Sequence, residues 1–69
     1  MNAIRKLSDK AKAFCEFEQK EIRRYKANGQ RQFEIEEVRK LRGYLQCLKD
    51  MECITFSEMQ SLYIFYATM

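Results

Sequence analysis

Apolar residues recur every three or four positions along the first part of the chain, which is the spacing of one face of an α-helix. They are Ile4, Leu7, Ala11, Phe14, Cys15, Ile22 and Tyr25. The pattern predicts a helix over about residues 3–27, with Ser8 or Asp9 as an alternative start because both residue types are favourable N-caps. Asn28 and Gly29 follow, and such residues adopt the left-handed conformation that ends many helices. The first helix is therefore expected to stop at Ala27.

The same spacing returns after this stop. Its apolar positions are Val38, Leu41, Tyr44, Leu45, Leu48 and Met51. Glu34, Glu36 and Glu37 lie near the start of the segment, where negative charge favours a helix. A second amphipathic helix is therefore predicted over about residues 31–51.

A third helix is predicted from a start signal rather than from its periodicity. Thr55 and Glu58 have the spacing of a capping box, in which each side chain binds the backbone N–H of the other residue. Ile54 and Met59 flank the box as a hydrophobic staple. These signals place the helix over about residues 56–68. Residues 62–66 are also rich in strand-favouring side chains, so the alternative is that residues 55–69 form a strand or a membrane-surface segment.

A connection as short as residues 28–30 folds two helices back against each other in antiparallel order. The predicted contacts across this hairpin are Tyr25 with Phe33, Phe14 with Tyr44, and Leu7 with Met51. The predicted fold is all-α: one small domain over residues 1–69, made of an antiparallel helical hairpin and a short C-terminal helix.

The small size of the chain favours stabilisation by a partner. A domain of 69 residues rarely gains more than about 3–5 kcal/mol from its own core. The third helix is apolar on most of its circumference, so it needs burial on most of its sides. A dimeric helical bundle would supply that burial. The predicted contact residues are Phe56, Leu62, Tyr63, Ile64, Phe65, Tyr66 and Met69, with Tyr63 and Tyr66 divided between core and interface.

Glu18 interrupts the apolar stripe of the first helix between Phe14 and Ile22. The antiparallel register places it opposite Arg39 and Lys40, which predicts a salt bridge across the hairpin. The alternative is a carboxyl group with a raised pKa, or one that receives a basic group from a partner.

Positive charge is concentrated in the predicted hairpin, because all 13 basic residues precede position 50 while the 10 acidic residues extend to Glu58. Basic side chains on a helical scaffold can bind phosphate groups. The candidate contacts are Lys20, Arg23, Arg24, Lys26 and Arg31. A nucleic-acid-associated regulator that uses this surface is the alternative function.

The composition gives little support to catalysis or metal binding. The chain has no histidine, and its three cysteines, Cys15, Cys47 and Cys53, contain no Cys-x-x-Cys pair. We therefore expect no catalytic residues, no metal site and no cofactor. No apolar run reaches the roughly 18 residues of a transmembrane helix, and the charged N-terminal segment lacks the apolar centre of a signal peptide. A cytoplasmic protein without a transmembrane segment is expected.

The leading functional expectation is a small non-enzymatic protein-interaction or regulatory module. It would act through its apolar helical surface, as a homodimer, on a larger protein, or both.

Overall fold

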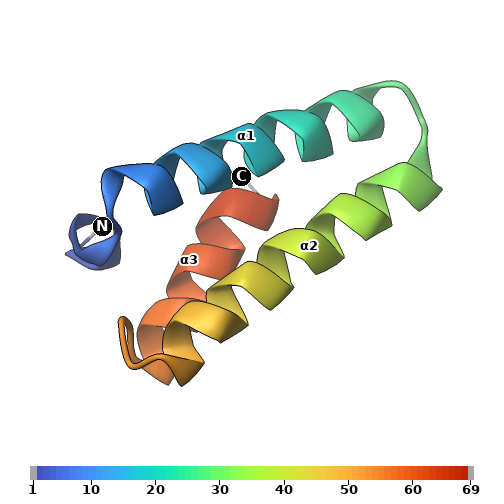
Figure 1. The fold of residues 1–69 in the computed structure, drawn as a ribbon. Helices are drawn as coiled ribbons and strands as arrows, with labels where there is room; N and C mark the ends of the chain where they lie inside the picture. The colour runs from blue at the N-terminus through green and yellow to red at the C-terminus, as the bar shows by residue number, and fades with distance from the viewer. Residues whose placement is uncertain (1, 69) are drawn as a thin grey trace.

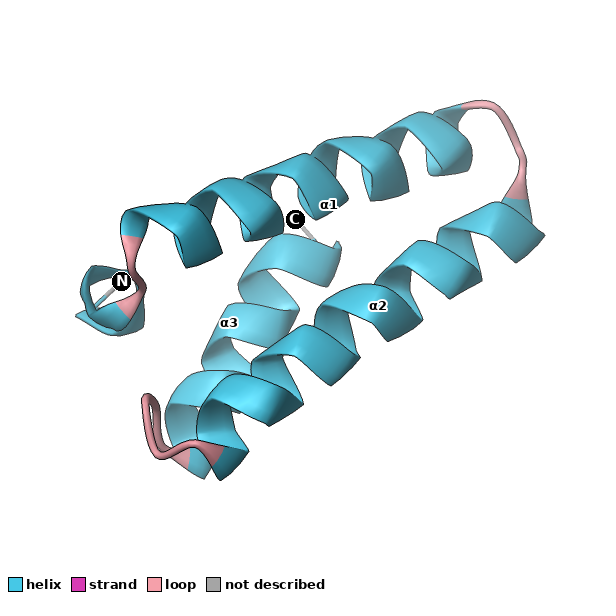
Figure 2. Ribbon diagram, viewed as in Figure 1, coloured by secondary structure: helices cyan, strands magenta, loops and turns pink. Residues whose placement is uncertain are grey.

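The fold is entirely helical in the part of the chain that the structure describes, residues 2–68 of a computed structural model. A short 3₁₀ helix, η1 (Asn2–Lys6), precedes three α-helices, α1 (Asp9–Ala27), α2 (Arg31–Asp50) and α3 (Phe56–Thr68). Figure 2 shows the loops confined to the short connections between these elements. The predicted all-α class is confirmed, and the strand alternative for residues 62–66 is wrong.

The first helical segment is interrupted at Leu7 and Ser8, so it is not one continuous helix over residues 3–27, and the alternative start at Ser8 or Asp9 is confirmed. The backbone N–H of Leu7 closes the 3₁₀ turn by donating to Ile4 O at 3.1 Å. Ser8 then caps α1, since its hydroxyl oxygen accepts from the N–H of Ala11 at 3.1 Å. A serine side chain that binds a helical N–H favours a new helix start over continuation. The break turns Leu7 and Ala3 into the core.

The turn between α1 and α2 has the hydrogen bonds of a Schellman motif. Gln30 N donates to Tyr25 O at 2.9 Å, and Gly29 N donates to Lys26 O at 3.2 Å. Gly29 takes the left-handed conformation with φ of 70°, which glycine adopts without a steric penalty. The predicted helix stop at Ala27 is confirmed.

The end of α2 repeats this motif without a glycine. Cys53 N donates to Leu48 O at 2.9 Å, and Glu52 N donates to Lys49 O at 3.0 Å. Glu52 occupies the left-handed position with φ of 63°. A residue with a Cβ atom is strained there by about 1–2 kcal/mol. The second turn therefore stores strain that the first turn avoids.

Two of the three predicted contacts across the hairpin are confirmed. The rings of Phe14 and Tyr44 stack with their centroids 4.2 Å apart, and those of Tyr25 and Phe33 lie 5.5 Å apart. The third prediction fails because Met51 caps α2 and is exposed. Leu7 instead lines a small cavity of about 120 Å³, to which Leu48 and Cys53 also contribute.

Helix α3 starts beneath the C-terminal end of α2 and crosses one face of the hairpin to the middle of α1 (Figure 1). The core forms where the three helices meet. Its fully buried side chains are Cys15, Leu41, Leu45 and Leu62. At the far end of α3, the Gln19 side-chain amide donates to Phe65 O at 3.4 Å. The molecule measures 35 × 18 × 18 Å, so α3 covers only part of one long face.

Candidate functional site

The start of α3 is fixed by the predicted capping box. Thr55 N donates to Glu58 Oε1 at 2.8 Å, and Glu58 N donates to Thr55 Oγ1 at 3.1 Å. Glu58 Oε2 also lies 2.7 Å from Lys6 Nζ, which ties η1 to α3. The carboxylate of Glu58 consequently has a lowered pKa, chiefly because of Lys6 and then because of the Thr55 N–H.

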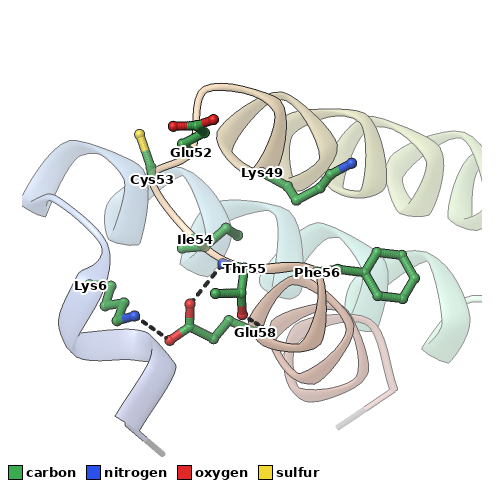
Figure 3. A pocket seen from close by; sticks show the side chains of 8 residues that line it. All are labelled: Lys6, Lys49, Glu52, Cys53, Ile54, Thr55, Phe56 and Glu58. Carbon is green, nitrogen blue, oxygen red and sulfur yellow. Dashed lines mark hydrogen bonds and ion pairs between the residues drawn. The ribbon is translucent and has the colours of Figure 1, made fainter.

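These contacts line a pocket of about 390 Å³ at the start of α3 (Figure 3). The carboxylate of Glu58 reaches back toward Lys6 and the backbone of Thr55, while the ring of Phe56 points out of the pocket on the other side. A helix N-terminus attracts anions, but here Glu58 already fills that role. The pocket is therefore accounted for by the helix cap.

The predicted contact residues that the structure describes fall into three groups. Leu62 and Tyr66 are buried within the chain itself, where they offer no surface to a partner. Tyr63 and Phe65 are half-buried against the core. Phe56 and Ile64 are 57% and 56% exposed. Met69 lies outside the described residues. The chain thus buries more of α3 by itself than the sequence suggested.

Phe56 and Ile64 lie on one stripe of α3, because residues eight apart in a helix are separated by about 80° of rotation. Beside this stripe, α2 and α3 enclose an open groove of about 400 Å³. Its lining residues are Arg42, Leu45 and Gln46 from α2, and Phe56, Met59, Gln60, Tyr63 and Ile64 from α3. The Arg42 guanidinium carbon lies 6.0 Å from the centre of the Tyr63 ring. The groove thus combines five apolar or aromatic side chains with the polar side chains of Arg42, Gln46 and Gln60.

The outward side of α3 carries no charge. Its exposed residues besides Phe56 are Ser57, Gln60, Ser61, Ile64 and Thr68. The one charged residue of this helix, Glu58, is engaged with Thr55 and Lys6 on another side. Charged residues make up 33% of the whole chain, whereas this side of α3 combines two large exposed apolar side chains with no charged residue.

Comparisons with protein-family models, with curated proteins and with solved structures found no match. Among residues 2–68, no helix has both the length and the apolar character needed to cross a membrane.

The five basic residues predicted to contact nucleic acid, Lys20, Arg23, Arg24, Lys26 and Arg31, are all exposed near the turn of the hairpin. The four on α1 spread over nearly half of its circumference at 100° per residue. Arg24 is already engaged, since its Nε lies 2.8 Å from Glu21 Oε2 and its guanidinium lies 4.5 Å from the centre of the Tyr25 ring. The nucleic-acid alternative stays a prediction.

Glu18 does not have the partner that the sequence predicted. It is 3% exposed and faces Glu37 of α2, while Lys40 pairs with Glu37 at 3.1 Å. Burial raises the pKa of Glu18 to about 7, and the hydrogen bond and negative charge of Glu37 reinforce the rise. The same hydrogen bond lowers the pKa of Glu37.

Two exposed rings were missed by the sequence analysis. Phe17 is 57% exposed and Phe33 is 50% exposed. Phe17 points away from α3. Gln19, which reaches α3, lies two residues further along α1 and is therefore turned about 160° from Phe17 around the helix axis. Phe17 lies outside the helical stripe, so the spacing gave no signal for it. Phe33 makes the predicted contact with Tyr25 and is still half-exposed, which the predicted pairing did not indicate.

The three cysteines differ in environment. Cys15 is fully buried, and burial, followed by the charges of Glu16 and Glu18, raises the pKa of its thiol to about 11. Cys47 and Cys53 are free and exposed. Within residues 2–68, no group of three or more potential ligands comes together that could hold a metal ion.

Proposed function

We propose that this protein is a small non-enzymatic interaction module that forms a homodimer through the groove between α2 and α3 and the stripe beside it. The observation that carries the proposal is the exposure of Phe56 and Ile64 next to an open groove. Exposed apolar side chains that gather beside a concave surface are typical of protein contact sites. In this role the module acts as a regulator or adaptor that presents a paired helical surface.

A second copy of the chain fits this surface because the surface has both projecting apolar side chains and a recess that can receive them. In a twofold dimer the same patch meets itself, so each projecting group must find a recess on the same patch. Phe56 and Ile64 project from α3, and the groove that they border is a recess. One copy can therefore place an apolar side chain in the groove of the other, and receive one in return.

The distribution of charge also favours a second copy of this chain as the partner. The chain carries a net charge of +3, so two copies repel each other when their charged sides meet. The outward side of α3 has no charged residue, and Arg42 is the one charged residue among those that line the groove. Pairing through this side brings the fewest like charges together.

The extent of the contact follows from the area that a specific interface needs. Such interfaces bury about 800 Å² on each partner, which is roughly a sixth of the 4969 Å² surface of this chain. Two side chains cannot supply that area. The contact must extend across the groove to Arg42 and Gln46 on α2.

The test compares Ile64→Glu with a matched control, Phe17→Glu. Both changes place a carboxylate at an apolar helical position with nearly equal exposure, 56% for Ile64 and 57% for Phe17, but only Ile64 lines the groove. The proposal predicts that size-exclusion light scattering gives a dimer for the unmodified chain and for Phe17→Glu. It predicts a monomer for Ile64→Glu, because the twofold contact would bring two carboxylates into an apolar interface.

Circular dichroism of both variants must show unchanged helicity, so that a lower mass reports dissociation and not unfolding. The proposal fails if Ile64→Glu keeps the mass of the unmodified chain, or if Phe17→Glu dissociates it instead. Absorbance at 260 and 280 nm during the same run tests the alternative, since co-eluting nucleic acid would favour the basic hairpin surface.

A further inference from the structure

A pair of carboxyl groups bridges α1 and α2 at the middle of the hairpin. Glu18 is nearly inaccessible to solvent at 3% exposure, and no N–H or O–H group among the described residues donates to its buried Oε2. The carboxyl group of Glu18 makes a hydrogen bond with that of Glu37. Lys40 Nζ lies 3.1 Å from Glu37 Oε1. Two acids and one base therefore meet across the two helices.

The aromatic contacts of the hairpin flank this pair. Phe14, one turn before Glu18, stacks on Tyr44 of α2. Tyr25, two turns after Glu18, packs against Phe33. Apolar contacts on both sides keep water from solvating a negative charge on Glu18, and an unsolvated buried charge is strongly unfavourable.

The surrounding charges also favour one proton on the pair. From α2, Glu37 opposes the ionisation of Glu18, and the charge of Lys40 favours it. From α1, Glu21 opposes it as well. The one charged residue of α3 is Glu58, which pairs with Lys6 at the other end of that helix. Lys40 neutralises a single carboxylate, so the second carboxyl group is stable only when protonated.

We propose that Glu18 and Glu37 share one proton across the hairpin and form a proton-sensitive latch that holds α1 against α2. When the proton leaves to solvent, the hydrogen bond becomes a repulsion between two carboxylates, and the hairpin loosens. The latch acts on the fold itself and does not depend on the proposed dimer.

The direction of the pH dependence follows from the proton balance. The pKa of Glu18 is about 7 in the folded chain, against 4.5 for an ordinary glutamate. Between these values the folded chain holds a proton that the unfolded chain has released. The stabilising contribution of Glu18 is fully present at pH 4.5 and is lost as the pH rises through 7. At lower pH Glu37, whose pKa is lowered, takes up a proton of its own, and the pair no longer shares a single proton. The chain has no histidine, which is the side chain that ordinarily titrates in this range.

The test is thermal unfolding at pH 5 and pH 8, with Glu18→Gln as the variant and Glu16→Gln as the control. Glutamine keeps the size and a hydrogen-bond donor at position 18 but cannot ionise. Glu16 is an exposed neighbour on the same helix. We expect the Tm of the unmodified chain and of Glu16→Gln to fall by roughly 10 °C between the two pH values. We expect the Tm of Glu18→Gln to change little and to exceed that of the unmodified chain at pH 8.

An equal Tm at the two pH values for the unmodified chain would overturn the latch, as would an equal fall for Glu18→Gln. A second measurement needs no variant. The carboxyl carbon of Glu18, followed by NMR in the unmodified chain, should titrate with a midpoint near 7, and a midpoint near 4.5 would also overturn the proposal.

Discussion

The ring of Phe14 on α1 stacks on the ring of Tyr44 on α2, with their centroids 4.2 Å apart and their planes inclined by 30°. This contact fixes the register of the hairpin next to the carboxyl pair of Glu18 and Glu37. Stacked rings in a protein are worth about 0.5–1.5 kcal/mol beyond the area that they bury.

A double-mutant cycle should measure that coupling. We expect Phe14→Leu and Tyr44→Leu each to lower the free energy of unfolding in urea, and the double variant to lose about 1 kcal/mol less than the sum of the two. Phe14→Leu combined with Phe56→Leu is the control pair, because Phe56 lies on the groove side of α3. Additive losses for Phe14 and Tyr44 would show that the stack contributes nothing of its own.

The reciprocal cap of α3 should be equally measurable. Thr55→Ala removes the oxygen that accepts from Glu58 N, and the loss of such a cap lowers the free energy of unfolding by about 1 kcal/mol. Ser57→Ala, on the outward side of the same helix, should change it much less. Chemical denaturation compares the two variants. An equal effect at both positions would mean that the cap is not what stabilises the start of α3.

Adding a glycine at the second turn and removing the glycine of the first turn should change the free energy of unfolding in opposite directions. Glu52→Gly should raise the free energy of unfolding by up to about 1 kcal/mol, because it relieves a left-handed residue that carries a Cβ atom. Gly29→Ala should lower it by about 1 kcal/mol or more, since Gly29 has the same conformation. Thermal unfolding of the two variants tests the pair. A stabilising Gly29→Ala would contradict the described turn.

The cysteines should react in two classes. Cys47 and Cys53 are exposed, so a thiol reagent at neutral pH should modify both in the folded chain. Cys15 is fully buried and its pKa is raised to about 11, and only the thiolate is a strong nucleophile. We expect mass spectrometry to find two modifications in the folded chain and three after denaturation. Rapid modification of Cys15 without denaturant would show that the core opens readily.

The sequence predicted the local features of the fold well. The stop after Ala27 and the cap formed by Thr55 and Glu58 depend on residues within one helical turn, and both occur as expected. The register of the hairpin was also predictable, because the loop is short and aromatic residues recur on both helices. Such features need no knowledge of how α3 packs.

The features that sequence analysis missed depend on packing between distant segments. Leu62 was predicted as a contact residue and Tyr66 as divided between core and interface, yet both are buried because α3 crosses one face of the hairpin. Glu18 meets Glu37 because Glu37 faces the seam between α1 and α2, whereas Arg39 is turned about 160° away from it around α2. Matching opposite positions along two antiparallel helices does not show which side of α2 faces α1.

The absolute mass of the unmodified protein in solution tests the proposed homodimer most directly. Light scattering during size exclusion, repeated at increasing protein concentration, measures that mass without a variant or a label. The proposed homodimer predicts twice the 8.4 kDa of one chain, with the dimer fraction rising with concentration and nearly independent of salt, because the contact is apolar. A mass that stays at 8.4 kDa at every concentration would contradict it.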